Sequence, residues 1–267
     1  MIKENLKKIQ NRIQIAEKKS GRSENSVKLM AVSKFHPVSQ IIEAVEQEQF
    51  LFGENRVQEA VQKFTDPSFE GFKNKISLHQ IGQLQSNKVK QIVKIADCIE
   101  SVDRIELLQE IEKQCAKIEK KIQILFEIHT AEDSKSGYDS EKLLFESLKA
   151  CSQNDFPHIT AKGFMTMAPF TQDERLVRKS FITLRTLSEK MKKESFQIWT
   201  FLNFQWECQM TLKLRLKKVL QLFVLVLQFL EKGIIPDEKK IHNSENLTFF
   251  SHFEFNNSSV LRRHNTA

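Results

Sequence analysis

Glycine is scarce in this chain. The sequence has seven glycines among 267 residues, whereas an average usage of about 7% would give roughly nineteen. Proteins that alternate strands and helices need glycine in their turns and in the loops that approach a ligand closely. The scarcity therefore indicates that a glycine-rich segment, which such a protein would normally carry, is missing here.

Cysteine is also scarce, and its spacing argues against two kinds of site. The four cysteines, Cys98, Cys115, Cys151 and Cys208, lie far apart and form no CxxC pair. This spacing favours reduced thiols in a cytoplasmic protein over a disulfide framework, and it predicts no metal site of the zinc type.

Long apolar spans and a leader segment are lacking as well. The N-terminus begins an amphipathic helix without the apolar core of a signal peptide. The apolar run 219–230 has twelve residues, two of them glutamines, which is too short to span a bilayer. The net charge is +7, but lysines and glutamates interleave along helix-like stretches, which favours solvated helix faces over a nucleic-acid-binding surface. We therefore expect binding to neither nucleic acid nor a membrane.

What the sequence does have is a repeated order of strand and helix. After a leading helix over 2–19, apolar runs typical of buried strands alternate with segments of helical periodicity six times. The strands are expected at 27–32, 50–52, 76–81, 98–101, 122–128 and 159–167, and the helices at 39–47 (with Ser39 as its cap), 55–64, 86–95, 103–116, 140–151 and 173–193.

Such alternation predicts a parallel sheet, because parallel strands need crossover helices. Six units by about residue 193 suit a (β/α)8 TIM-type barrel whose last two strand units are lost or replaced, and a doubly wound open sheet is the alternative. We expect an α/β barrel domain over 1–200, an aberrant segment over 201–267, and a disordered polar tail over 236–267.

Lys34 is the strongest candidate for a functional side chain. It follows the apolar run Leu29 to Ser33 directly, at the end of the first expected strand. A lysine partly withdrawn from water at the end of a parallel strand loses affinity for its proton, and the neutral amine can form a Schiff base with an aldehyde.

Six segments, in order and at matching spacing, carry a family resemblance. They are Ala31-Val32-Ser33-Lys34 with Pro37, residues 52–59, residues 79–88, Ser101-Val102-Asp103-Arg104, the loop with Glu132, Lys135 and Gly137, and Gly163-Phe164-Met165-Thr166-Met167. Together they resemble the pyridoxal phosphate homeostasis protein family over about residues 1 to 195, and members of that family share the alanine racemase N-terminal barrel. One departure is Glu127-Ile128-His129, and we assign no role to His129.

The resemblance implies a cofactor site at the mouth of the barrel. Pyridoxal 5'-phosphate (PLP) would be held as a Schiff base on the lysine that matches Lys34. Asn55 and His79 would contact the pyridine ring or its oxygen, although a helix cap and a loop hydrogen bond are the alternatives for these two residues. Met165 would pack beside the ring or in the core.

The resemblance also implies a monomeric cytoplasmic carrier or regulator of vitamin B6, with PLP as its ligand and PLP-dependent apoenzymes as candidate partners. It implies no committed reaction and no catalytic residue. The alternatives are a racemase or decarboxylase on the same barrel, which needs a second domain or a partner's base, and a membrane-associated or interaction protein that uses the apolar run 219–230.

The end of the chain departs from the family, whose last strands carry a serine–methionine–glycine turn and a glycine-rich phosphate-binding segment. Shifting the reading frame of the back-translated sequence from Phe204 gives SMGMSND, and permitted codons continue it to a glycine-rich stretch. The single codons of Trp206 and Met210 constrain this reading. We therefore infer a frameshift near 195–204, and we expect this chain to fold poorly or to cover the gap with residues 219–230.

Overall fold

The part of the chain that can be described forms a curled sheet with helices around it. The computed structural model describes residues 2–19, 21, 23–130, 136–169, 171, 173–193, 203–207 and 221–225. The described residues all fall within one compact unit, Met1–Glu231. The polar tail expected over 236–267 and two residues of the family resemblance, Glu132 and Lys135, lie outside the described residues.

The strands are β1 (Lys28–Val32), β2 (Leu51–Glu54), β3 (Ser77–Gln80), β4 (Cys98–Val102), β5 (Ile122–Glu127), β6 (Ile159–Met167), β7 (Asn203–Glu207) and β8 (Gln221–Leu225). The helices are α1 (Ile2–Lys19), α2 (Val38–Val45), α3 (Val57–Phe64), α4 (Val89–Ile92), α5 (Ile105–Ala116), α6 (Glu141–Ser152) and α7 (Glu174–Lys193), with 3-10 helices η1 (Pro67–Phe72) and η2 (Ser86–Lys88).

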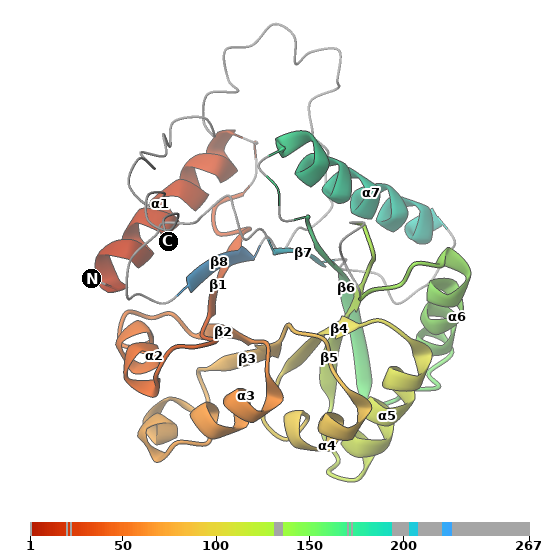
Figure 1. Ribbon diagram of the computed structural model, residues 1–267, viewed down its shortest axis with the longest axis horizontal. Helices are drawn as coiled ribbons and strands as arrows, with labels where there is room; N and C mark the ends of the chain where they lie inside the picture. The colour runs from red at the N-terminus through yellow and green to blue at the C-terminus, as the bar shows by residue number, and fades with distance from the viewer. Residues whose placement is uncertain are drawn as a thin grey trace, which may run out of the picture. The chain divides into compact units, whose positions relative to one another are not determined.

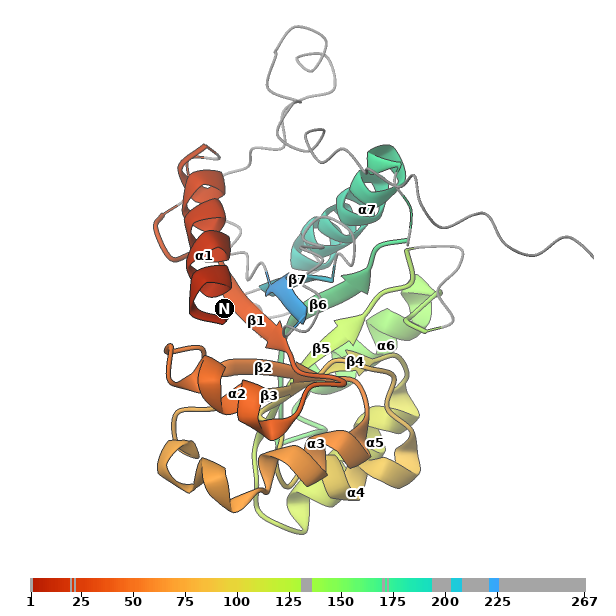
Figure 2. The ribbon, with the colours of Figure 1, turned by 60° about the vertical axis from the view of Figure 1, so that its left-hand side comes forward.

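The six expected strand–helix units are confirmed. Strands β1 to β7 pair in parallel, each with the next along the chain, and the sheet order is β7-β6-β5-β4-β3-β2-β1-β8. A doubly wound sheet would reverse this order at a switch point, so the strand order favours the barrel. Helices α2 to α6 lie on the outer side of the curl in two views (Figures 1 and 2). The fold is therefore a partial TIM-type barrel.

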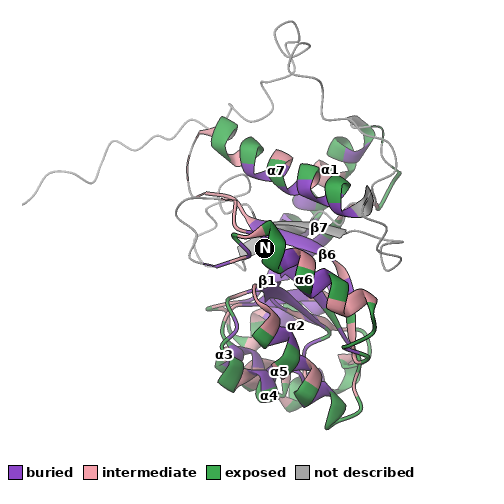
Figure 3. Ribbon diagram, turned by 90° about the vertical axis from the view of Figure 1, so that its right-hand side faces the viewer, coloured by how far each residue is buried: buried purple, intermediate pink, exposed green. Residues whose placement is uncertain are grey.

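The strands are mostly buried, whereas the helices around them carry many exposed residues (Figure 3). The main apolar core joins outward strand residues such as Ala31, Phe52 and Ile99 to the helices. Because side chains alternate along a strand, the intervening residues face the inside of the curl. Two small clusters made of strand and strand-end side chains lie there, one of Met30, Val32 and Ile81, the other of Cys98, Leu125 and Met165.

Two local predictions were wrong, and one short helix was not anticipated. Pro37, not Ser39, precedes the first residue of α2, and it supplies no side-chain cap, so Ser39 lies inside the helix. The helix expected over 86–95 is one turn of 3-10 helix followed by the short α4. The 3-10 helix η1 was not anticipated; Asp66 caps it by accepting a hydrogen bond from Ser68 N at 2.9 Å. In each case local chemistry, not periodicity, decides the boundary.

The expected gap beyond α7 is covered by two short strands. β7 pairs in parallel with β6, with Gly163 opposite Asn203. β8 comes from the apolar run 219–230 and pairs with β1 in the antiparallel direction, with Lys28 opposite Leu225 and Val32 opposite Gln221. A complete barrel of this class has parallel strands throughout. Here the strand next to β1 is β8, and it runs antiparallel to β1.

A search of the described helices finds none that is both long enough and apolar enough to cross a membrane.

Candidate functional site

The register of β1 and β2 places Lys34 and Asn55 at one level of the curl. Val32 is the Cα partner of Gly53, and Lys34 and Asn55 each lie two residues further toward the carboxyl end of their strands. Both therefore continue the inward-facing rows of β1 and β2. His79 of β3 is the Cα partner of Gly53 in β2. It therefore lies one layer deeper in the curl than Lys34 and Asn55. Three adjoining strands thus bring these side chains toward the same mouth of the curl.

Lys34 lies in the turn that follows β1. The turn bends sharply at Phe35. Its φ of 65° lies in the left-handed region, which residues other than glycine rarely adopt. Phe35 is 70% exposed, and the Arg56 guanidinium lies over its ring, 5.7 Å from the centroid. Lys34 itself is half-buried. A strained turn thus carries the candidate lysine.

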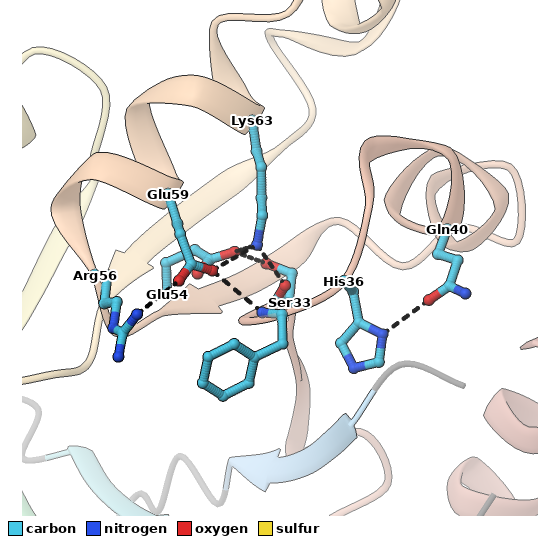
Figure 4. A network of polar contacts seen from close by, with 8 residues as sticks. Ser33, His36, Gln40, Glu54, Arg56, Glu59 and Lys63 are labelled. Atoms are coloured by element: carbon cyan, nitrogen blue, oxygen red, sulfur yellow. Dashed lines mark hydrogen bonds and ion pairs between the residues drawn. The ribbon is translucent and has the colours of Figure 1, made fainter. Parts of the chain in front are cut away.

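A polar network on the outer side of the sheet holds this turn (Figure 4). Lys63 Nζ, from α3, donates to the Ser33 carbonyl oxygen at 2.8 Å, to Glu54 Oε1 at 3.0 Å and to Glu59 Oε2 at 3.2 Å. Ser33 Oγ donates to Glu54 Oε1 at 2.7 Å, and Phe35 N donates to Glu59 Oε2 at 3.2 Å. The backbone on both sides of Lys34 is therefore held by hydrogen bonds from the outer side of the sheet.

Glu54 is the centre of that network. Its side chain is fully buried, and that of Lys63 is 12% exposed. Burial raises the pKa of Glu54, and the hydrogen bonds from Ser33 and Lys63 oppose that shift. A buried carboxylate is tolerated when a cation and donors surround it, so Lys63 provides the charge that keeps this support intact.

Asn55 is held through its backbone, and its side-chain oxygen is buried. Gln80 Nε2 donates to the Asn55 carbonyl oxygen at 2.9 Å, and a Cβ on Gly82 would lie 2.5 Å from that same oxygen. Asn55 Oδ1 is buried and has no hydrogen-bond partner among the described residues. Asn55 is not a helix cap, because Arg56 holds that position in α3. A buried acceptor without a donor costs free energy, so the geometry suits a ligand donor.

His79 is paired with a carboxylate that sequence analysis did not anticipate. It lies inside β3, and its Nδ1 is hydrogen-bonded to Oε1 of Glu100 in β4. Glu100 is fully buried, which raises the pKa of its carboxyl, while the hydrogen bond and charge of His79 lower it in part. Cys98, the cross-strand partner of His79, is buried beside the pair. The pairing fixes the His79 ring on the inner face of the sheet.

Met165 lies in β6, 1% exposed, and packs with Cys98 and Leu125. It belongs to the apolar wall of the inner face, on the far strands from Lys34. His129 follows β5, and its Nδ1 lies 3.3 Å from the Ser136 carbonyl oxygen. This contact ties the histidine to the loop that follows β5.

Sequence reasoning missed the residues that support the site. Glu54 lies in the segment 52–59 that the resemblance singles out, but Glu59 and Lys63 look like an ordinary helix ion pair four residues apart. Glu100 was hidden inside an expected buried strand. A charged residue at the centre of an otherwise apolar strand is the one signal that could have revealed it.

The fold and the site define a class, and a family model confirms it. The model for the alanine racemase N-terminal domain matches residues 5–203. The pyridoxal phosphate homeostasis protein of Pasteurella multocida is 36% identical over 194 residues, 72% of this chain and 81% of that protein. Its counterpart in Vibrio alginolyticus is 34% identical over 200 residues, 74% of this chain and 84% of that protein. The chain belongs to the pyridoxal phosphate homeostasis protein family.

Solved structures agree with the assignment. PipY of Synechococcus elongatus, whose structure has PLP bound, is 28% identical with a TM-score of 0.63, over 74% of this chain and 84% of that chain. An alanine racemase of Clostridium difficile is 13% identical with a TM-score of 0.54, over 69% of this chain and 47% of that chain. At this identity the likeness to the racemase concerns the fold alone.

Proposed function

We propose that this chain binds PLP for vitamin B6 homeostasis, with the cofactor attached to Lys34 as a Schiff base. The observation that carries the proposal is the position of Lys34, half-buried at the end of β1 and level with Asn55, in a family whose relative PipY has PLP bound. Lys34 would hold the cofactor through its amine, and the bound cofactor would supply the aldehyde with which a lysine forms a Schiff base.

The residues around Lys34 fit such a ligand. Asn55 Oδ1 is a buried acceptor without a partner among the described residues, and it would orient a donor on the cofactor. Gly82 lets the chain pass close to Asn55. His79, fixed by Glu100, would present its other ring nitrogen to the cofactor, and Met165 would supply an apolar wall.

The network of Lys63, Glu54 and Glu59 acts through the turn. It fixes the backbone of Ser33 and Phe35, so the turn that carries Lys34 would already be ordered before the cofactor binds. Holding a reacting group in place in advance favours bond formation. These three residues would act as positioning residues, through the backbone of the turn.

The role that fits best is a carrier or regulator and not a catalyst. The relatives are named for homeostasis of the cofactor, and the likeness to the racemase is confined to fold. We further propose a monomer in the cytoplasm that exchanges PLP with PLP-dependent apoenzymes. Widely spaced cysteines suit that reducing compartment.

Absorbance spectroscopy of the full-length chain with PLP tests the attachment. We expect a new visible absorbance band. Borohydride should remove the band and leave the cofactor covalently attached to the chain. Lys34→Ala should abolish the band. Lys28→Ala is the matched control, since Lys28 is exposed at the opposite end of β1, and it should leave the band unchanged. A band that persists in Lys34→Ala would refute the attachment, and turnover of an amino acid by the pure chain would favour a racemase or decarboxylase.

A further inference from the structure

Three side chains with different donor atoms converge on the inner face of the sheet. His79 Nδ1, Cys98 Sγ and a carboxylate oxygen of Glu100 all lie within 4.8 Å of one another. Cys98 is the cross-strand partner of His79, and Glu100 follows two residues later on the same side of β4. In the described part of the chain, no other group of three or more such donors is found. The geometry points to a binding site for one divalent ion of the zinc type on His79, Cys98 and Glu100.

Burial and charge support this assignment. Cys98 is 2% exposed and Glu100 is fully buried. Glu100 Oε2 is buried with no hydrogen-bond partner among the described residues, a costly state that coordination to a cation removes. A divalent ion with one thiolate, one carboxylate and a neutral imidazole has no net charge. A neutral complex is the form that the apolar wall of Leu125 and Met165 tolerates best.

The donor set selects the metal. Sulfur, nitrogen and oxygen together suit zinc or cobalt, whereas magnesium and calcium prefer oxygen ligands alone. Three protein ligands leave the fourth tetrahedral position for water or a small ligand. On binding, the Cys98 thiol releases its proton to solvent, and no redox step is involved. Cysteine spacing predicted no zinc site because it detects ligands close in sequence, and these three meet through strand pairing.

Metal binding without the cofactor tests the site independently of the proposed function. The full-length chain is reduced, stripped with a chelator, and equilibrated with zinc or cobalt in the absence of PLP. We expect one equivalent of zinc by elemental analysis, and a thiolate-to-cobalt charge-transfer band in the near ultraviolet. Cys98→Ser should abolish the band and weaken zinc binding at least about tenfold. Cys151→Ser, which removes a thiol of α6 that packs against the main core and not in the cluster of Cys98, should change neither.

X-ray absorption of the zinc-loaded wild-type chain decides the question should Cys98→Ser fail to fold. The site predicts one sulfur neighbour at about 2.3 Å together with nitrogen and oxygen neighbours. A wild-type chain that takes up no stoichiometric zinc overturns the proposal, as does bound zinc without a sulfur neighbour. A charge-transfer band that survives in Cys98→Ser also overturns it, because the thiolate would then come from another cysteine.

Discussion

At the scale of single residues, the turn that carries Lys34 depends on a second lysine, Lys63. Lys63 neutralises Glu54 and binds the Ser33 carbonyl oxygen next to Lys34. Both partners are largely withdrawn from water, so their interaction is screened far less than that of a surface ion pair. The position of Lys34 is therefore linked to the packing of α3 against the sheet.

Replacing Lys63 with methionine removes the charge of the side chain while keeping most of its volume. Lys63→Met leaves the Glu54 carboxylate buried without its cation, and we expect a loss of about 3 kcal/mol in the free energy of unfolding. Adding Glu54→Gln should recover much of the loss. The control, Lys113→Met, breaks an exposed pair with Glu110 and should cost less than about 1 kcal/mol. Urea denaturation measures all four chains, and equal losses for Lys63→Met and Lys113→Met would contradict the assignment.

At the scale of elements, the joint after β3 is set by close packing of two backbones. Gly82 faces the Asn55 carbonyl oxygen and Cα, which a Cβ would approach to 2.5 and 2.8 Å. Backbone atoms on both sides leave the neighbours little freedom to move. This glycine therefore fixes where Asn55 lies at the mouth.

Gly82→Ala should destabilise the fold and weaken cofactor binding together. We expect a cost of about 1–3 kcal/mol from overpacking and a lower PLP affinity because Asn55 is displaced. Gly71→Ala is the matched control, since a Cβ there meets no atom within 4 Å. Thermal unfolding and PLP titration of both variants make the comparison. If Gly82→Ala unfolds and binds PLP like the wild type, the backbone around Gly82 can accommodate a methyl group and the prediction is wrong.

The helices α5 and α6 each carry a thiol against the core. Burial raises the pKa of Cys115 to about 11 and that of Cys151 to about 12, and the nearby Glu112 carboxylate adds to both shifts. The folded chain therefore keeps thiol protons that the unfolded chain releases above its ordinary pKa of 9.0. Stability from these groups is complete below that pH and falls as the pH rises toward the folded values.

Denaturation in reducing buffer should show this dependence. Between about pH 9 and 11 we expect each thiol to lower the free energy of unfolding by up to about 1.4 kcal/mol per pH unit. Cys115→Ala should be less stable at neutral pH and should lose stability with a shallower slope at high pH. An unchanged slope in that variant would mean that the folded thiol ionises normally.

The elements were more predictable from sequence than the site. Six strands and their helices follow from apolar periodicity, because each element buries one face. Lys34 could be found because it directly follows a strand. The pairing of His79 with Glu100, and the support of Lys34 by Lys63, could not, because residues 21 and 30 positions apart in the chain meet only when strands and helix pack.

At the scale of the whole molecule, the end of the chain is the part that does not match its family. The family model stops at residue 203, and the strand that closes on β1 is antiparallel. A barrel of this kind binds phosphate at glycine-rich loops after its last strands. The reading-frame hypothesis accounts for the missing glycines and for the mismatched strand together.

Restoring the reading frame near 195–204 should improve both folding and binding. We expect the corrected chain to unfold at a higher temperature and to bind PLP at least about tenfold more tightly, because backbone amides at a helix N-terminus would then hold the phosphate. Thermal denaturation and PLP titration of both chains make the test. Resequencing the gene shows whether the shift is real, and a corrected chain that is no better than this one would contradict the hypothesis.

Peptide mapping tests the central claim, that Lys34 holds the cofactor, most directly. The full-length chain is loaded with PLP, reduced with borohydride, digested, and analysed by mass spectrometry. The account predicts the added mass of the reduced cofactor on the peptide that contains Lys34, with the other lysines unlabelled. Label on a different lysine, or no label at all, would contradict it.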